Sequence, residues 1–359
     1  FGPGLNLYAA LSPPQCRRGY PVAADVGFVH LHVHSAYSLL EGALPIARLA
    51  ELAKADKQPA LALTDTDNMF GALEFSEKMA AYGIQPIIGC ALAIDFADQE
   101  AGPRNGYANA HRPRLVLLAA TEAGYRSLMR LNSRAFLETP SNEAPHAKLS
   151  WLDGETGGLI ALTGGPGGPL DTAIAAGQGG LGAARADVLM GLFGDRLYVE
   201  LQRQGVAHRV TEPALIDIAY AKGLPLIATN EAFFAKAEDY EAHDALICIA
   251  EGKLIADGGR RQLTTEHHFK SRAEMMALFA DLPEALASTV EIARRCAVRP
   301  RTLAPILPRF SRGDAAVDEA AELRRQAEAG LEKRVATQGL APGHTIEGYR
   351  ERLTYELGI

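Results

Sequence analysis

Short buried strands and amphipathic helices alternate through most of the 359 residues, and this alternation predicts an α/β fold with a mainly parallel, helix-covered sheet. Two further patterns agree with this fold class. A histidine-rich stretch, FVHLHVHSAYSLLEG at residues 28–42, begins the regular part of the chain. Polar residues then follow the ends of several predicted strands, which is where parallel α/β proteins place their chemistry.

Each predicted element follows from its local sequence. Residues 44–57, LPIARLAELAKADK, have apolar residues at helical spacing, and Pro45 suits a first helical turn. Residues 59–64, PALALT, form a short apolar run that predicts a buried strand. By the same criteria, further helices are predicted at residues 71–82, 121–137 and 210–222, and further strands at residues 28–34, 86–94, 115–120, 159–163, 196–201 and 224–229.

Helices replace the alternation after Leu263. They are predicted at residues 272–279, 284–296, 314–338 and 346–357, and a proline-rich connector, RPRTLAPILPRF, lies between the second and the third. Prolines beside a change in composition are typical of a domain boundary. We therefore expect a disordered or non-native leader at residues 1–27, a barrel domain at 28–285, and a connector with the incomplete start of a second domain at 286–359, cut from a longer protein.

Charge and cysteine content limit the possible functions. The region from Arg294 onward carries 12 Lys and Arg against 9 Asp and Glu, whereas the first 293 residues carry 24 against 34. Because nucleic acid attracts basic surfaces, any DNA contact is expected after Arg294. Four widely spaced cysteines without a CxxC pair, together with the lack of a membrane-length apolar run, indicate a cytoplasmic protein in a reducing compartment.

The histidine-rich stretch predicts the beginning of a metal site. His30, His32 and His34 alternate, so they are expected to share one face of a strand, and Glu41 follows in the next turn. A phosphoesterase with two or three metals needs further His, Asp and Glu ligands past the other strands. The residues found there are Asp65, Thr66, Asp67, Cys90, Ala91, Gly164, Gly165, Glu200, Asn230, Glu231 and Phe233, and as a ligand set they are incomplete.

Several longer motifs link the chain to a known family. They are, in order, FVHLHVHSAYSLLEG, PALALTDTDNMFGALEF, GIQPIIGC, LVLLAATEAGYRSLMRLNSRAFLE, GLIALTGG, LPLIATNEAFF and LFADLPEALASTVEIARRC. With these motifs the chain resembles, from residue 28 to 359, the N-terminal part of the alpha subunits of bacterial DNA polymerase III, the C-family replicative polymerases. The resemblance implies a (β/α)7 barrel of the polymerase-and-histidinol-phosphatase (PHP) type, followed by a mostly helical beginning of a palm domain.

The resemblance also implies where metal ligands would stand. The acidic and histidine positions that remain are His32, His34, Glu41, Asp65 and Glu231. The positions where the family's ligands are replaced carry Thr66, Ala91, Arg114, Gly165 and Phe233.

Arg114 argues most strongly against a metal, because a fixed positive charge takes the place of a ligand. It is expected instead to neutralise Glu41, Asp65 or Glu231. We therefore expect no bound metal, and the alternative is one weakly held Zn²⁺ on His32, His34 and Glu41.

The implied function belongs to a longer parent protein. The family synthesises DNA on a DNA template with Mg²⁺ held by palm carboxylates, which are expected after Ile359, so this fragment alone is expected to be inactive. The barrel is expected to have lost hydrolytic chemistry and to be a scaffold that docks the separate proofreading exonuclease subunit. The parent would also meet a sliding clamp, other holoenzyme subunits and primer-template DNA. Two alternatives are a stand-alone metal-dependent phosphoesterase resembling histidinol phosphatase and a non-catalytic interaction module.

Overall fold

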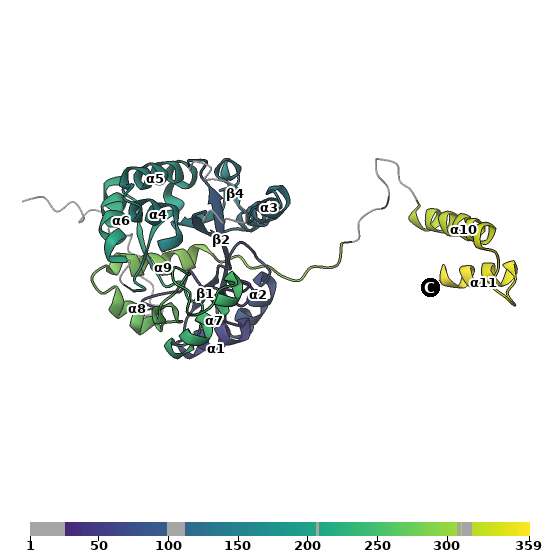
Figure 1. The fold of residues 1–359 in the computed structure, drawn as a ribbon, viewed down its shortest axis with the longest axis horizontal. Helices are drawn as coiled ribbons and strands as arrows, with labels where there is room; N and C mark the ends of the chain where they lie inside the picture. The colour runs from purple at the N-terminus through teal and green to yellow at the C-terminus, as the bar shows by residue number, and fades with distance from the viewer. Residues whose placement is uncertain (1–25, 99–111, 206–207, 307–309, 311–317) are drawn as a thin grey trace, which may run out of the picture. The chain divides into compact units, whose positions relative to one another are not determined.

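The computed structural model describes residues 26–98, 112–205, 208–306, 310 and 318–359. The compact structure divides between Thr302 and Leu303. The first unit is a seven-stranded sheet with helices packed around it, and the second is a pair of helices (Figure 1). The predicted α/β class is therefore confirmed. The expected leader lies outside the described residues except for Val26 and Gly27.

Most strands are short and buried, and all except β4 lie close to predicted strand ranges. They are β1 (Ala60–Leu63), β2 (Gln85–Asp95), β3 (Arg114–Ala119), β4 (Ala147–Lys148), β5 (Leu159–Leu162), β6 (Leu197–Gln202) and β7 (Leu226–Thr229). The sheet has the order β1-β2-β3-β5-β6-β7, and β4 pairs with β2.

Helices cover this sheet and then form the second unit. Those of the first unit are α1 (Ile46–Ala55), α2 (Ala72–Ala81), α3 (Glu122–Glu138), α4 (Pro169–Ala175), α5 (Gly179–Phe193), α6 (His208–Lys222), α7 (Tyr240–Glu251), α8 (Arg272–Leu278) and α9 (Pro283–Arg295). Those of the second unit are α10 (Glu319–Gln338) and α11 (Ile346–Glu356). Helices α4, α5 and α7 are not among the predicted elements.

One strand runs against the expected parallel arrangement. The pairs β1–β2, β2–β4, β5–β6 and β6–β7 are parallel, but β3 is antiparallel to both β2 and β5. Arg114, the first residue of β3, consequently pairs with Ala93 near the end of β2. The amino end of β3 thus lies at the same edge as the carboxyl ends of the parallel strands, and we call this edge the mouth of the barrel.

The histidine segment, residues 28–34, is not the regular strand that was predicted. Only one isolated bridge, between Val33 and Ala232, joins it to the chain after β7. Two of its amides bind threonine hydroxyls in place of strand carbonyls: Val33 donates to Thr64 Oγ1 at 2.9 Å and Val29 to Thr289 Oγ1 at 3.0 Å. The segment nevertheless lies between β1 and the chain after β7, so it connects the two ends of the sheet.

The boundary expected at residue 285 lies too early, because α9 belongs to the first unit. Its buried face includes Leu286, Thr289 and Ile292, and it packs against β7. The division after Thr302 is therefore the one that the packing supports.

The second unit and the outer surface differ from the core of the first unit. Neither α10 nor α11 has a buried residue.

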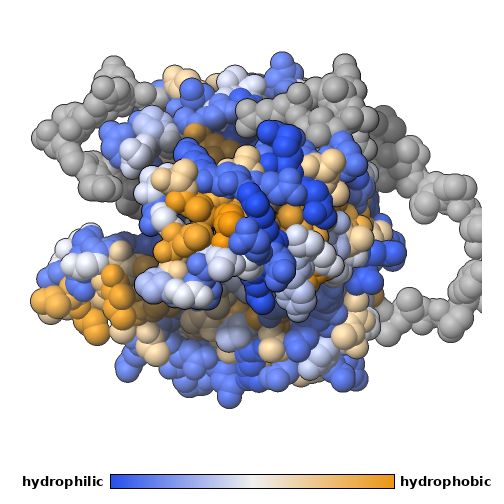
Figure 2. Space-filling view, turned by 90° about the vertical axis from the view of Figure 1, so that its right-hand side faces the viewer, coloured by the Kyte–Doolittle hydropathy of each residue, from blue (hydrophilic) through white to orange (hydrophobic). Residues whose placement is uncertain are grey.

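On the face shown in Figure 2, apolar side chains gather in patches bordered by hydrophilic ones. Among the described helices, none combines the length and apolar character that crossing a bilayer requires.

Candidate functional site

Two histidines and one glutamate meet at the mouth. The side-chain donor atoms of His32, His34 and Glu231 all lie within 4.8 Å of one another. Glu231 Oε1 is 3.1 Å from His34 Nε2 and 3.6 Å from His32 Nε2. Both imidazoles are almost fully buried, with exposures of 2% and 1%. His30 does not join them, because its Nε2 lies 2.7 Å from the carbonyl oxygen of Lys270.

Glu200, from β6, orients His32. Its Oε1 lies 2.7 Å from His32 Nδ1, and the carboxylate also accepts hydrogen bonds from Gly164 N, Gln202 Nε2 and Thr229 Oγ1. Burial opposes a charged imidazole, but the charges of Glu200 and Glu231 outweigh burial and raise the pKa of His32. His32 Nε2 has no hydrogen-bond partner among the described residues and faces Glu231.

Glu231 and Glu200 are held as carboxylates. Burial acts to raise the pKa of Glu231, but the charge of His32 and the hydrogen bond to His34 hold it well below the usual range. The pKa of Glu200 is also lowered, because His32 outweighs the effect of burial. His32 thus lies between two carboxylates, the buried Glu200 and the partly exposed Glu231.

Asp65 is occupied by the loop after the histidine segment. Its carboxylate accepts hydrogen bonds from Ser35 N at 2.6 Å, Ser35 Oγ at 2.8 Å and Ser38 Oγ at 2.6 Å. Asp65 itself is only 1% exposed. Asp65, which was expected at a metal-ligand position, therefore stabilises this turn in the structure.

Glu41 belongs to an ion pair outside the histidine group. Arg261 Nη1 lies 2.7 Å from Glu41 Oε1, and Thr66 Oγ1 donates to Glu41 Oε2 at 2.7 Å. Burial acts to raise the pKa of Glu41, but Arg261 and Arg114 lower it. The zinc alternative on His32, His34 and Glu41 is thus wrong in its carboxylate, because Glu231 takes that place.

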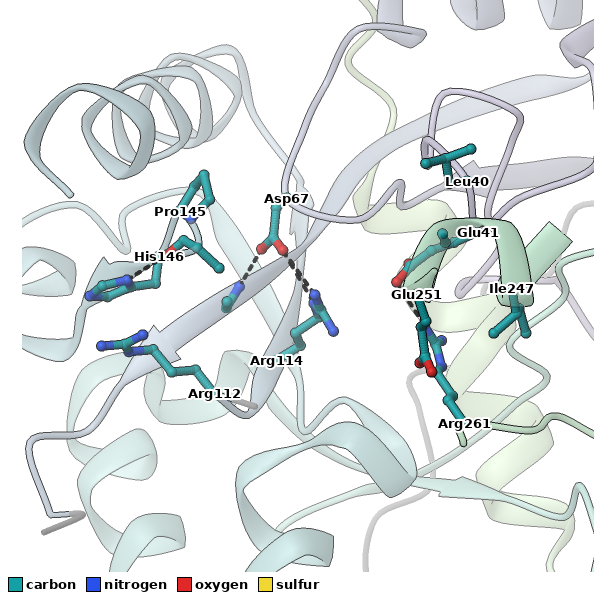
Figure 3. A pocket seen from close by; sticks show the side chains of 13 residues that line it. Leu40, Glu41, Asp67, Arg112, Arg114, Pro145, His146, Ile247, Glu251 and Arg261 are labelled. Atoms are coloured by element: carbon teal, nitrogen blue, oxygen red, sulfur yellow. Dashed lines mark hydrogen bonds and ion pairs between the residues drawn. The ribbon is translucent and has the colours of Figure 1, made fainter. Parts of the chain in front are cut away.

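Arg114 pairs with Asp67, which was not among its expected partners. Arg114 Nη2 donates to Asp67 Oδ2 at 3.1 Å, and Ala93 N donates to Asp67 Oδ1 at 2.7 Å. Figure 3 shows this pair in the pocket, with Arg261 and Glu41 on another part of the wall. The pocket has a volume of about 210 Å³. The mouth therefore holds two guanidinium–carboxylate pairs beside the histidine cluster.

The replaced ligand positions are physically filled. A Cβ on Gly165, whose φ is +57°, would lie 2.5 Å from Gln202 Cδ, so a larger residue there would collide with that amide. The Phe233 ring stacks on His34 with centroids 4.3 Å apart and an interplanar angle of 3°. Ala91 has no side-chain donor atom. Among the described residues these three positions therefore offer no side-chain ligand for a second metal.

One metal ion would fit the remaining donors better than several would. Zinc bonds of about 2.1 Å place tetrahedral ligands about 3.4 Å apart. The separations of 3.1 and 3.6 Å from Glu231 to the two histidines lie close to that value. The residues present thus match at most a single ion with three protein ligands.

Sequence reasoning missed two contributors to this site and the ion-pair partner of a third. Arg261 follows Glu41 by 220 residues, and no local pattern in the sequence indicates their contact. No pattern in the sequence indicates that Gln202 lies beside Gly165. Asp67 was noted past a strand, but its pairing with Arg114 depends on the antiparallel direction of β3.

Comparison with known proteins agrees with the predicted fold class. The family model described as PHP domain matches residues 30–204. DNA polymerase III subunit alpha from Caulobacter vibrioides (strain NA1000 / CB15N) is 46% identical over 340 residues, which cover 94% of this chain and 29% of the relative. The protein of the same name from Treponema pallidum (strain Nichols) is 39% identical, over 80% of this chain and 25% of the relative.

A solved amidohydrolase from Chromobacterium violaceum is more distantly similar. It has 17% identity and a TM-score of 0.37, and the match covers 57% of this chain and 87% of that one. The chain spans less than a third of the length of its polymerase relatives. Over nearly all of its residues the chain is therefore similar to DNA polymerase III alpha subunits, and residues 30–204 match the PHP domain.

Proposed function

We propose that this chain is part of a cytoplasmic DNA-directed DNA polymerase that copies the chromosome, and that its PHP barrel is a scaffold without hydrolytic activity. The observation that carries the proposal is 46% identity to a DNA polymerase III subunit alpha over 94% of the chain. The relative is more than three times longer, so most of the proposed enzyme lies outside this sequence.

The parent enzyme would use metal chemistry that this fragment does not supply. In nucleotidyl transfer, two Mg²⁺ ions activate the primer hydroxyl and stabilise the leaving pyrophosphate, and carboxylates hold them. We place those carboxylates after Ile359. The fragment alone is therefore inactive in DNA synthesis, and its own contribution is structural.

Filled ligand positions support the scaffold role. Arg114 and Arg261 each neutralise a carboxylate at the mouth, and Phe233 and Gln202 occupy space that a further ligand would need. A guanidinium keeps its charge at all physiological pH values, so the positive charge of each pair is permanent. The barrel then offers its outer surface for docking, and we propose the proofreading exonuclease subunit as its partner. The sliding clamp, the other holoenzyme subunits and primer-template DNA would bind through the rest of the parent.

The test is primer extension by the full-length parent with Mg²⁺, beside the same assay on residues 1–359. Extension by the parent and none by the fragment is expected. A parent that binds primer-template but never extends it would overturn the polymerase assignment. Direct binding of the exonuclease subunit to residues 1–359 is also expected, and its failure would remove the docking role alone.

The second candidate is a PHP phosphoesterase that resembles histidinol phosphatase, and the His32, His34 and Glu231 group favours it. A single Zn²⁺ there would act as a Lewis acid and lower the pKa of a bound water. Metal analysis of the purified chain and an assay with a generic phosphate ester decide between the two. We expect less than about 0.1 equivalent of bound metal per chain and no hydrolysis of the phosphate ester. Stoichiometric metal with hydrolysis would establish the phosphoesterase instead.

A further inference from the structure

Helix α9 closes the end of the barrel opposite the mouth. Its last turn contacts residues at the amino ends of two strands: its main-chain carbonyls meet Gln85, the first residue of β2, and its side chains meet Tyr198, the second residue of β6. Arg295 Nη1 donates to the Tyr198 hydroxyl at 2.8 Å, and that hydroxyl donates to Glu291 Oε1 at 3.1 Å. The helix is thus attached across the sheet and not only along β7.

The last turn of α9 is capped by the barrel. Gln85 Nε2 donates to the carbonyl oxygens of Ala293 at 2.6 Å and Cys296 at 3.0 Å. Carbonyls at a helix C-terminus have no hydrogen-bond partner within the helix. The Gln85 amide therefore supplies donors to carbonyls that would otherwise be buried without a hydrogen bond. A single side chain at the start of β2 therefore holds the end of α9 in place.

The buried face of α9 packs into the barrel interior. Ile292, Ala293 and Cys296 belong to the same apolar cluster as Val29 and Leu31 of the histidine segment. Thr289 is fully buried, and its hydroxyl accepts the Val29 amide hydrogen while donating to the Leu286 carbonyl. The first residues of the histidine segment are therefore held by α9.

The chain after α9 stays attached to the barrel as far as the division between the two units. Ser76 Oγ on α2 donates to the Pro300 carbonyl at 2.9 Å, and Thr302 Oγ1 donates to Glu77 Oε1 at 2.7 Å. The last attached residue, Thr302, is also the last residue of the first unit. The path into the second unit consequently begins beside α2.

The histidine segment spans the distance from α9 to the mouth. It begins at the Val29–Thr289 hydrogen bond, and its middle is paired with β1 through the Ala62 amide and the His30 carbonyl. It ends where the His34 amide donates to the Ala232 carbonyl at 3.0 Å, beside Glu231. It is thus a short extended connection between the two ends of the barrel.

We propose that α9 and residues 296–302 together hold the histidine segment in position. A change in how residues 296–302 attach to the barrel then changes how firmly the residues at the mouth are held. The coupling passes from Gln85 and Thr289 through Val29 to His34. This inference does not depend on the polymerase function, because it concerns only contacts inside the first unit.

The experiment is amide hydrogen exchange of the full chain, read by NMR at Val33 and His34. Their own partners, Thr64 and Ala232, are untouched by the variants. Thr289→Val is isosteric and removes the acceptor for Val29. We expect exchange at Val33 and His34 to rise on the order of tenfold, since opening the segment becomes easier. Thr289→Ser keeps the hydroxyl and is expected to stay within about twofold of the parent chain.

Two further variants keep the inference falsifiable. Gln85→Met removes the cap on α9 and should produce the same rise at His34, even if Thr289→Val does not fold. Thr121→Val removes the hydroxyl that caps α3 through Gly124 N, far from α9, and should leave His34 unchanged. An unchanged His34 in Gln85→Met, or an equal rise in Thr121→Val, would show that the mouth is not coupled to α9 in particular.

Discussion

At the mouth of the barrel, individual residues determine whether a site holds metal or ion pairs. Arg114 brings a permanent charge to the place of a ligand, and Asp67 compensates it at 3.1 Å. Burial raises the pKa of Asp67 although Arg114 and the Ala93 amide act to lower it, so the carboxylate depends on its partners to stay charged. Removing the guanidinium would leave a buried charge with fewer partners.

Arg114→Ala is expected to lower the free energy of unfolding by about 1–3 kcal/mol, which is the range for losing a partner of a buried polar group. Chemical denaturation with urea measures it. Arg126→Ala is the control, because Arg126 is 65% exposed and pairs with Glu122 only across one helical turn. That control should stay within about 0.5 kcal/mol of the parent chain. A similarly small loss for Arg114→Ala would contradict the structural role of the pair.

A second prediction at this scale concerns Gly165. Gly165→Cys should destabilise the barrel by about 1–3 kcal/mol, because the position has a positive φ and the new Cβ would meet Gln202. The double variant with Gln202→Ala should recover part of this loss, since the collision is then removed. Strictly additive effects in a double-mutant cycle would mean that the two side chains do not compete for the same space.

At the scale of elements, a buried carboxyl joins two helices that pack on the sheet. Asp171 on α4 is 5% exposed, and Thr211 Oγ1 on α6 donates to its Oδ1 at 2.9 Å. Its Oδ2 has no partner among the described residues. Burial raises the pKa of Asp171 from 3.8 to about 7. This contact therefore favours the protonated acid.

The sign of the pH effect follows from that shift. The pKa of Asp171 is higher in the folded state than in the unfolded state, so the protonated form stabilises the fold. This contribution is complete below the unfolded pKa of 3.8 and is lost as the pH rises through about 7. Asp171→Asn cannot ionise, so its stability relative to the parent chain should rise between pH 4 and pH 8 by about 1 kcal/mol or more. Every other titrating group is common to both proteins, so the difference in urea unfolding free energy isolates Asp171. A difference that does not vary with pH would refute the shift.

At the scale of the whole molecule, the two units contribute unequally to stability. The first unit contains three clusters of buried apolar residues, while α10 and α11 contain no buried residue. Burial of apolar area is the main stabilising term in folding, so the first unit must supply nearly all of the cooperative unfolding.

Truncation tests this division. A chain that ends at Thr302 should melt within about 2 °C of the full chain, because no packed core is lost. A chain that ends at residue 285 loses Thr289, Ile292 and Cys296 and should melt more than about 5 °C lower or fail to fold. Circular dichroism against temperature measures both. Equal melting of the two shorter chains would mean that α9 is not part of the barrel.

Local pattern was sufficient for most of the elements but not for their directions. Helices α1, α2, α3 and α6 and strands β1 to β3 lie close to their predicted ranges, because apolar spacing in those segments matches one period clearly. Strand β3 is equally apolar whichever way it runs, so its antiparallel pairing was not predictable. Helix α5 begins with Gly179 and Gly180, and its many small residues leave no apolar stripe to recognise.

The sequence by itself determined the α/β class and the similarity to DNA polymerase III alpha subunits, because these depend on residue type and order along the chain. Only the tertiary structure decided which charges meet. In the structure Arg114 pairs with Asp67, and Arg261 pairs with Glu41. Glu231 lies next to the two histidines. Electrostatic and packing interactions act over a few ångströms between residues as far as 260 positions apart, and no local sequence pattern records such a distance.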